Sequence, residues 1–359
     1  MPPLRPSRKL DHLRLALGPV RAGAGWQDVH LVHNALPEAS LEQVDLRTSL
    51  LGAALPVPVI INAMTGGVPQ AAAINRVLGG LAAAFGIPVA VGSQRAALDD
   101  PSLAPTYAAV RTENPGGIVM ANLGAGATPL EARRAVAMVG ADLLQLHLNA
   151  PQELVMAEGD RDFRGQLEAI AAVVAGCGVP VVVKECGFGM SAETAGRLHA
   201  VGVRAVDVGG RGGTNFARIE ARRLDPPSAV DPGLLDWGIP TAASLLEVTT
   251  AGWPGLDVVA SGGVRFGSEA ARALAMGACA VGIAGALLQS LHHGGADAAR
   301  GFLEGFLRDL RTAALLVGAT TLADLRRAPR VLTGFTREWA EQRCAGPRVD
   351  GVPAPWSQH

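Results

Sequence analysis

From about residue 56 the chain alternates between short apolar runs and longer amphipathic stretches. The apolar runs are rich in Val and Ile and are nearly continuous, which is typical of strands buried on both faces of a parallel sheet. We count eight of them, at residues 56–63, 87–93, 117–124, 142–149, 179–185, 204–210, 257–263 and 279–285. The pattern therefore predicts eight buried strands.

The stretches between these runs have the spacing of amphipathic helices, and several of them stop at a glycine, as a helix C-cap does. Examples are residues 70–86, 129–140, 191–202 and 267–278. Eight strand–helix units over roughly 235 residues match a single (β/α)₈ TIM barrel of the α/β class better than two doubly wound domains.

This interpretation sets the predicted domain limits. Residues 1–55 form an N-terminal extension, residues 56–345 form the barrel with closing helices from about residue 286, and residues 346–359 form a Pro-rich tail. The connection at about 211–241, which contains GRGGTNFARIEARR, is too long for a simple turn. Loops of that length commonly serve as lids or binding loops.

The charge balance and the cysteine content limit the partners and the cellular compartment that we expect. The 359 residues carry 31 Lys plus Arg against 32 Asp plus Glu, so no basic surface for nucleic acid is expected. The four cysteines form no CxxC pair, which favours a reducing, cytoplasmic setting. The first residues lack the apolar core of a signal peptide, and no run of about 18 apolar residues could span a membrane.

Lysine is almost absent, since Lys9 and Lys184 are the only two among the 31 cationic residues. A coding bias that replaces Lys by Arg explains the scarcity. The two lysines are then either chance survivors or positions where a compact ammonium is needed and a planar guanidinium does not fit.

Polar residues and glycines follow the predicted strands at their carboxyl ends, which is the rim where barrels of this type place their chemistry. The rim residues are Asn62, Ala63, Met64, Thr65, Gly66, Gly67, Gly92, Ser93, Gln94, Arg95, Asn122, His147, Asn149, Gln152, Glu153, Lys184, Glu185, Asp207, Thr214, Ser261, Gly262, Gly263, Ala284 and Gly285. All eight strands contribute, so we predict a functional site there.

The glycine pairs after the seventh and eighth strands predict a phosphate-bearing cofactor, because glycine lets an anion approach backbone N–H groups. Lys184 ends an apolar strand, so it either extends to solvent or faces an electron-rich ring that becomes anionic on reduction, such as the N1–C2=O edge of a flavin. Asn122 and Ser93 on neighbouring strands would contact the same ring.

Two further groups suit a diphosphate. Glu153 is either an ordinary solvated carboxylate at a helix start or the single protein ligand of a Mg²⁺ ion that also binds phosphate oxygens. The chain has no zinc pattern of the HExxH or clustered-cysteine type. Near the N-terminus a compact group either forms a solvated tail or folds over the rim as a diphosphate clamp; its members are Arg5, Arg8, Lys9, Asp11 and His12.

Together these motifs resemble the FMN-dependent type 2 isopentenyl-diphosphate isomerases. The resemblance extends over nearly the whole chain, through RKLDH (8–12), INAMTGG (61–67), VGSQR (91–95), LHLNAPQE, EGDRDF, VKECGFGMS, GGRGGTNFARIE, DWGIPTAASL, SGGVR (261–265) and TGFTREW. Two departures are Ala157, where the family usually has proline, and the 346–359 tail, which has no counterpart.

The resemblance implies roles for individual residues. Arg8 and Lys9 would bind the substrate diphosphate, with further contacts from Arg95, His147, Asn149 and His12. Gln152 would touch the substrate, and Glu153 would carry Mg²⁺. The residues expected to line FMN are Ala63, Met64, Thr65, Ser93, Asn122, Lys184, Thr214, Gly262, Gly263, Ala284 and Gly285.

The implied reaction is the interconversion of isopentenyl and dimethylallyl diphosphate, an isoprenoid diphosphate reaction without net redox change. Few titratable side chains reach the hydrocarbon tail, so the N5 region of reduced FMN would act as acid and base. Gln152 and Glu220 are candidates for assisting proton transfer, and NADPH or NADH would only reduce the FMN. The family forms tetramers or octamers, so a homo-oligomer is expected.

Three alternatives remain. An FMN-dependent oxidoreductase of 2-hydroxy acids needs a catalytic His beside the sixth-strand glycine loop, but that loop reads VGGRGGTNF. A function similar to that of IMP dehydrogenase needs a nucleophilic Cys in a glycine loop. Cys186 is the candidate for it, although a small core thiol is the more ordinary role for this residue. A non-catalytic FMN-binding barrel would have a degraded diphosphate clamp, whereas Arg8, Lys9, Gln152 and Glu153 are all present.

Overall fold

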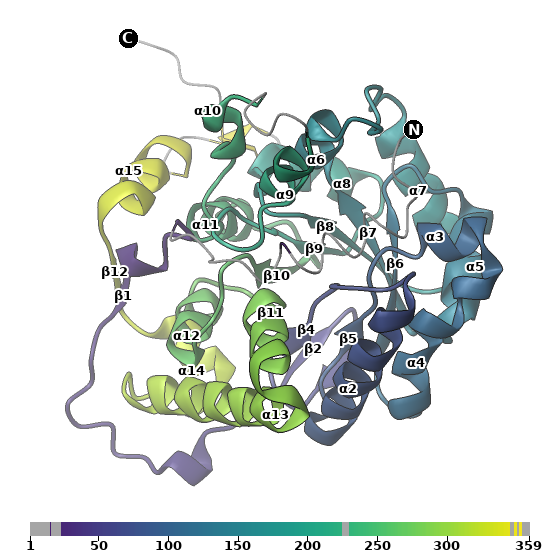
Figure 1. Ribbon diagram of the computed structural model, residues 1–359. Helices are drawn as coiled ribbons and strands as arrows, with labels where there is room; N and C mark the ends of the chain where they lie inside the picture. The colour runs from purple at the N-terminus through teal and green to yellow at the C-terminus, as the bar shows by residue number, and fades with distance from the viewer. Residues whose placement is uncertain (1–14, 16–22, 225–229, 345–347, 350–351, 354–359) are drawn as a thin grey trace.

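A closed barrel of eight parallel strands forms the centre of the molecule (Figure 1). The computed structural model describes residues 15, 23–224, 230–344, 348–349 and 352–353. The barrel strands are β4 (Val59–Ile61), β5 (Val89–Ala90), β6 (Val119–Gly124), β7 (Leu143–Leu148), β8 (Val181–Glu185), β9 (Ala205–Asp207), β10 (Asp257–Ser261) and β11 (Ala280–Ile283). β11 pairs with β4 and closes the ring, which confirms the predicted (β/α)₈ barrel.

Helices surround this barrel and connect its strands (Figure 1). The predicted helical stretches correspond to α2 (Pro69–Phe85), α5 (Pro129–Val139), α8 (Ala192–Ala200) and α12 (Gly267–Ala275). Gly86 and Gly140 cap α2 and α5 in the left-handed conformation, as predicted from the glycine stops. The other α-helices are α3 (Arg95–Asp99), α4 (Pro105–Glu113), α6 (Ala150–Val155), α7 (Gln166–Gly176), α9 (Phe216–Arg223), α10 (Pro232–Leu235), α11 (Thr241–Ala251), α13 (Gly285–Leu315), α14 (Leu322–Arg327) and α15 (Gly334–Arg343).

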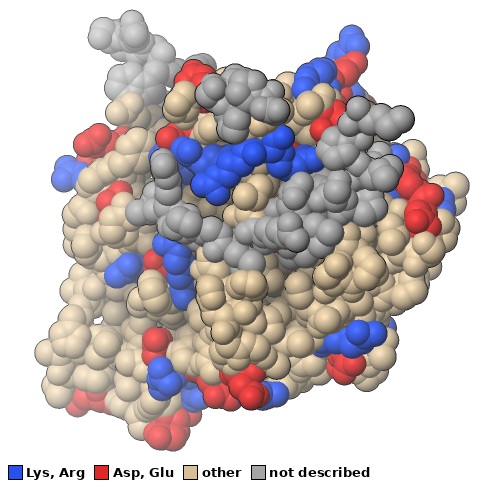
Figure 2. All heavy atoms as spheres, in the orientation of Figure 1, with Lys and Arg blue, Asp and Glu red and all other residues tan. Residues whose placement is uncertain are grey.

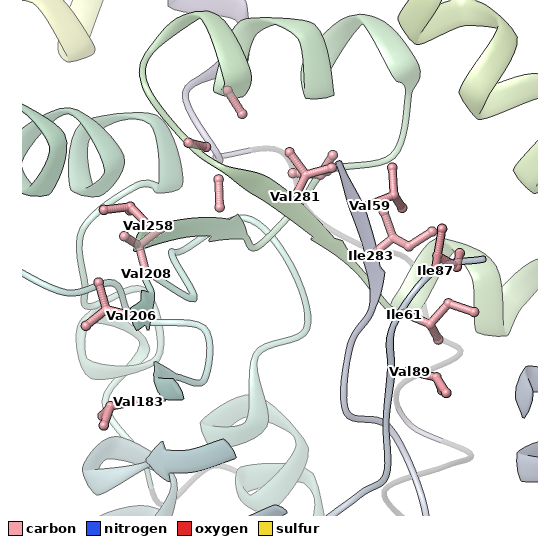
Figure 3. Close-up of a cluster of buried hydrophobic side chains, with 14 of the residues drawn as sticks. Val59, Ile61, Ile87, Val89, Val183, Val206, Val208, Val258, Val281 and Ile283 are labelled. Atoms are coloured by element: carbon pink, nitrogen blue, oxygen red, sulfur yellow. The ribbon is translucent and has the colours of Figure 1, made fainter. Parts of the chain in front are cut away.

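Side chains alternate between the two faces of each barrel strand, although the strand sequences are almost continuously apolar. Val59 and Ile61 of β4 pack outward in the core shared with the helices, together with residues such as Val183, Val206 and Val281 (Figure 3). Ile60, between them, belongs to a second cluster inside the barrel. The long apolar runs therefore supply two separate cores.

The N-terminal extension closes the bottom of the barrel. Strands β2 (Thr48–Leu50) and β3 (Ala53–Leu55) form an antiparallel hairpin. Leu50 and Leu55 of this hairpin are buried in the inner cluster, which also contains Ile60, Met120 and Val182. This apolar plug leaves the opposite, carboxyl end of the barrel as the place for a site.

A strand that precedes the barrel pairs with one that follows it. β1 (Val29–Leu31) pairs antiparallel with β12 (Arg330–Leu332), and the tail contains the short pair β13 (Arg348–Val349) and β14 (Val352–Pro353). The remaining short helices are η1 (Trp26–Asp28), η2 (Leu41–Gln43) and η3 (Pro101–Leu103). Among the described helices, none combines the length and apolar character needed to cross a membrane.

Candidate active site at the carboxyl ends of the barrel strands

A cavity of about 980 Å³ opens at the carboxyl ends of the strands. This volume lies in the range of small-molecule and cofactor sites. Every residue expected from the sequence to line a flavin lies on its wall: Ala63, Met64, Thr65, Ser93, Asn122, Lys184, Thr214, Gly262, Gly263, Ala284 and Gly285. Arg95, His147, Asn149, Gln152 and Glu153 line the same cavity.

A belt of polar side chains lies inside the barrel, one pleat above the apolar plug. Two residues after Ile60 comes Asn62, two after Met120 comes Asn122, and the same step leads to the other members of the belt, Gln145, Lys184, Asp207 and Ser261. All six are buried. The alternation of the strands therefore separates an apolar floor from a polar layer that faces the cavity.

Hydrogen bonds connect most of this belt. The Asp207 carboxylate accepts from Asn62 Nδ2 at 2.6 Å and from Ser261 Oγ at 2.7 Å. Asn62 Oδ1 accepts from Gln145 Nε2 at 3.0 Å, and Gln145 Oε1 accepts from Asn122 Nδ2 at 3.1 Å. Gln145 was not identified from the sequence. Its signal was a polar residue at an inward position of an apolar strand, two residues before His147.

Lys184 is a buried cation at the cavity wall, with 8% of its surface exposed. Its Nζ donates to the backbone oxygen of Glu185 at 2.8 Å and to Cys186 Sγ at 3.3 Å. Burial would lower the pKa of this ammonium, but the Asp207 carboxylate and the hydrogen bond to Cys186 outweigh it and hold the pKa above its usual value. Lys184 is therefore charged, which favours an anionic group in the cavity.

Two acidic groups follow Lys184 in the sequence, the buried Glu185 and the half-buried Cys186. Burial raises the pKa of Glu185 to about 8, although the N–H groups of Phe188 and Gly189 donate to its carboxylate at 2.5 and 3.2 Å. Burial likewise raises the pKa of the Cys186 thiol. A neutral thiol is a weak nucleophile, so the environment of Cys186 does not favour covalent catalysis.

Glycines allow a close backbone approach on the side of the cavity formed by β10 and β11. A Cβ on Gly262 would lie 2.2 Å from the Gly210 oxygen, and one on Gly263 would lie 2.4 Å from the Gly212 oxygen. Gly285 is the first residue of α13, and the side chain at that position would face Thr214 Oγ1 at 3.4 Å. The N–H groups of a helix start have no partner within the helix, so they suit a phosphate.

Two residues predicted to assist proton transfer meet through the packing of α6 against α9. Gln152 Nε2 donates to Glu220 Oε1 at 3.2 Å, across 68 positions of sequence. Glu220 is 1% exposed, does not line the cavity itself, and forms an ion pair with Arg223. Arg223 also lies 3.6 Å from Glu158. The orientation of the Gln152 amide is thus set by the Glu220 carboxylate and its partner Arg223, which lie on the side of Gln152 away from the cavity.

Glu153 lies in α6 beside the cavity. One carboxylate oxygen accepts from Asn149 Nδ2 at 2.7 Å, and the other accepts from the Asp160 N–H at 3.1 Å. Among the described residues no group of three or more His, Cys, Asp or Glu side chains is arranged to hold a metal ion. A cation at Glu153 would therefore have to take its other ligands from a bound molecule or from water.

The residues expected to bind the diphosphate are placed only in part. Arg95, at the start of α3, forms an ion pair with Glu131 and lies 3.7 Å from Asp99. Arg8, Lys9 and His12 lie outside the described residues. Figure 2 shows Lys and Arg side chains gathered in a band across the upper half of the face seen in Figure 1, which suits an anionic ligand.

Comparison with known proteins agrees with this arrangement. Residues 124–331 match the family of FMN-dependent dehydrogenases. A protein of Symbiobacterium thermophilum named isopentenyl-diphosphate delta-isomerase is 57% identical, over 95% of this chain and 96% of that protein. The chain belongs to the isopentenyl-diphosphate delta-isomerase family. A member of this family from Moorella thermoacetica is 50% identical, over 94% of this chain and 97% of its own length.

Solved structures of other proteins share the fold of this isomerase family. A mandelate oxidase variant with (S)-mandelic acid matches with a TM-score of 0.64 at 21% identity, over 92% of this chain and 95% of that chain. A putative lactate oxidase of Pediococcus acidilactici matches with a TM-score of 0.64 at 17% identity, over 91% and 87% of the two chains. Identities this low show the barrel fold alone.

The cavity fits the FMN that the family match supports. It has a suitable volume, a buried ammonium for a ring that gains negative charge, and glycines that bare the backbone where a phosphate would bind. The FMN predicted from the sequence is therefore supported by both the family and the donor set.

Proposed function

We propose that this protein interconverts isopentenyl and dimethylallyl diphosphate in a reaction that requires reduced FMN. The observation that carries the proposal is the 57% identity to a protein with this activity in its name, over 95% of this chain. The cavity supports it, because the described residues that the family resemblance assigns to cofactor, metal and substrate all line it.

The residues that would hold FMN divide into two groups. Gly262, Gly263 and Gly285, with the Thr214 hydroxyl, would bind its phosphate, and Lys184, Asn122 and Ser93 would contact the ring. When bound and reduced, FMN would supply the acid and base of the proton transfers. The Lys184 ammonium would lie beside the ring and stabilise its negative charge.

Gln152 and Glu220 would assist the proton transfer, Gln152 from the cavity wall and Glu220 through its hydrogen bond to Gln152. The Nε2 group of Gln152 donates to Glu220, so this amide group has a fixed orientation. Its oxygen would then accept a hydrogen bond from the cavity side. Arg223 forms an ion pair with Glu220, which favours the charged carboxylate. A charged carboxylate only accepts hydrogen bonds, so Gln152 donates to Glu220 with its Nε2 group.

Mg²⁺ would bind between Glu153 and the substrate diphosphate. One protein carboxylate with phosphate oxygens and water is a common coordination for Mg²⁺. Asn149 orients this carboxylate through its 2.7 Å hydrogen bond. Arg95, His147 and Asn149, together with Arg8, Lys9 and His12, would complete the diphosphate site.

NADPH, or NADH, would serve as the reductant of FMN and would not take part in each turnover.

We also propose a cytoplasmic homo-oligomer, a tetramer or octamer, whose ligands are small molecules, with no nucleic acid or membrane partner. The exposed apolar side chains of Leu234, Trp237 and Phe266 support self-association. Light scattering coupled to size-exclusion chromatography tests this point, and a monomer would contradict it.

The activity is tested with purified protein, FMN, Mg²⁺ and isopentenyl diphosphate under anaerobic conditions. Dimethylallyl diphosphate is measured by chromatography after addition of NADPH in an amount below that of the enzyme. Many turnovers per NADPH are expected, since the reaction has no net redox change. Absence of product, or product limited to one equivalent of NADPH, would reject the proposal.

A further inference from the structure

The polar belt of the barrel continues to His147 at the cavity wall. The hydrogen bonds run from Asp207 to Asn62 (2.6 Å), from Asn62 to Gln145 (3.0 Å), from Gln145 to Asn122 (3.1 Å) and from Asn122 Oδ1 to His147 Nδ1 (2.8 Å). The first four side chains are buried, with 1–4% of their surface exposed. Each is therefore held in the chain without competition from bulk water.

The chemistry of the groups gives this chain one direction. A carboxylate only accepts hydrogen bonds, so Asn62 must donate to Asp207 with its Nδ2 group. The N–H of Ala63 donates to Asn62 Oδ1 at 2.9 Å, which fixes the same amide orientation independently, because a backbone N–H can only donate. Asn62 Oδ1 is then the acceptor that faces Gln145.

The same reasoning fixes the amide orientations of Gln145 and Asn122. Gln145 donates to Asn62 with Nε2, so its Oε1 faces Asn122 and accepts from Asn122 Nδ2. Asn122 therefore turns Oδ1 toward the histidine. An amide oxygen can only accept, so the proton of this last hydrogen bond belongs to His147 Nδ1.

We propose that Asp207 is a positioning residue that, together with the Ala63 N–H, orients Asn62 and so sets the tautomer of His147 through Gln145 and Asn122. With the proton on Nδ1, the neutral ring of His147 has its lone pair on Nε2. The row of hydrogen bonds starts at the Asp207 carboxylate, which only accepts. This carboxylate also accepts from Ser261 Oγ at 2.7 Å and from the Gly209 N–H at 3.2 Å, and the Lys184 ammonium stabilises its negative charge.

This arrangement has a consequence for anion binding. A histidine tied through Nδ1 can offer Nε2–H to a phosphate oxygen only as the cation, and otherwise offers a lone pair that repels the anion. The diphosphate would therefore bind together with a proton on Nε2. That consequence rests on the proposed function, whereas the tautomer itself is a property of the protein without substrate.

The tautomer is read directly by NMR of FMN-loaded protein labelled with ¹⁵N in its histidine rings. In each tautomer one ring nitrogen carries no proton. That unprotonated nitrogen couples more strongly to the carbon-bound ring protons, so the strongly coupled nitrogen identifies the tautomer. His147→Gln identifies the signals of His147 among the eight histidines. In the unaltered protein we expect the Nδ1–H form to dominate by about tenfold, the preference that one net hydrogen bond supports.

Two variants test the long-range part. Asp207→Asn places an amide at the start of the chain, and Gln145→Met breaks it in the middle. Gln145→Met is expected to bring the two tautomers to within about threefold of each other or to reverse their ratio, and Asp207→Asn, in which the Ala63 N–H still holds Asn62, is expected to shift the ratio in the same direction by less. The matched control is Gln94→Met, since Gln94 is also a buried amide and bonds Asn122 only at its backbone N–H, at 2.9 Å, while its Nε2 donates to the Ala135 oxygen outside the belt.

The possible results separate clearly. A dominant Nε2–H form in the unaltered protein overturns the proposal, and so does an Nδ1–H form that neither variant disturbs. If Asp207→Asn does not fold, Gln145→Met against Gln94→Met decides. Because no substrate is present, the result does not depend on whether the protein isomerises isopentenyl diphosphate.

Discussion

Gly285→Ala separates the requirements of the fold from those of cofactor binding. Gly285 begins α13 and lies on the cavity wall beside Thr214. Its φ is not in the left-handed region, and a Cβ there meets nothing closer than Thr214 Oγ1 at 3.4 Å. The protein alone can therefore accommodate the methyl group, which would occupy the surface where a phosphate approaches the backbone.

The expected effects have opposite signs. Replacing Gly by Ala at a compatible position stabilises a protein by about 0.4–1 kcal/mol, which raises the Tm of the FMN-free protein by roughly 1 °C here. A hydrogen bond to a charged group contributes about 1.5–3 kcal/mol, so losing one backbone N–H contact to the phosphate weakens FMN binding about 10- to 100-fold. Differential scanning fluorimetry gives the Tm, and quenching of FMN fluorescence gives the Kd.

Gly301→Ala is the matched control, because Gly301 lies in the second part of α13, after the break in helical conformation at Gly294 and Gly295, with nothing within 4 Å of the added Cβ. This variant should gain similar stability and bind FMN as the unaltered protein does. An FMN Kd for Gly285→Ala within twofold of the unaltered value would refute the phosphate position. A large loss of stability would refute the steric argument.

Four further predictions concern charged groups. Lys184→Ala should lower the two-electron midpoint potential of bound FMN by about 30–60 mV, the equivalent of about 1.4–2.8 kcal/mol, and an unchanged potential would contradict the role of the ammonium. Glu153→Gln should raise the Mg²⁺ concentration for half-maximal activity about tenfold while the FMN Kd stays within twofold; a change in FMN binding alone would mean that the role is misassigned. Gln152→Ala and Glu220→Gln should show a coupling of about 0.5–3 kcal/mol in a double-mutant cycle on kcat, whereas additive effects would show that the two side chains act separately. Because burial raises the pKa of Glu185 from 4.5 to about 8, the folded state keeps a proton that the unfolded state releases, so the free energy of unfolding should fall between about pH 4.5 and 8. Glu185→Gln should remove that slope in urea titrations, and an unaltered slope would contradict the assignment.

The strand runs were readable in sequence because strands covered on both faces have to be apolar at almost every position. The glycine stops after α2 and α5 were readable because a left-handed cap favours glycine. Polar residues at the ends of those runs predicted the rim, and the cavity brings them together. These features are local, so each could be inferred from a short window of residues.

Other features depend on contacts between distant parts of the chain. Gln152 and Glu220 meet only because α6 packs against α9, and the sequence contains no periodicity that links those two helices. The barrel floor is closed by the β2–β3 hairpin from the N-terminal extension, which precedes the first barrel strand. Such pairings follow from the closure of the ring.

The amino-acid sequence by itself determined the barrel, its polar rim and the family, because burial and backbone conformation constrain residue types position by position. Only the tertiary structure decided which of the inward residues form a connected layer. Gln145 looks like any polar residue within a leucine-rich strand until strand register places it beside Asn122 and closure of the barrel brings Asn62 within reach across the interior. Hydrogen-bond direction is a property of such a layer as a whole, so the tautomer of His147 follows from four other side chains that the sequence places far apart.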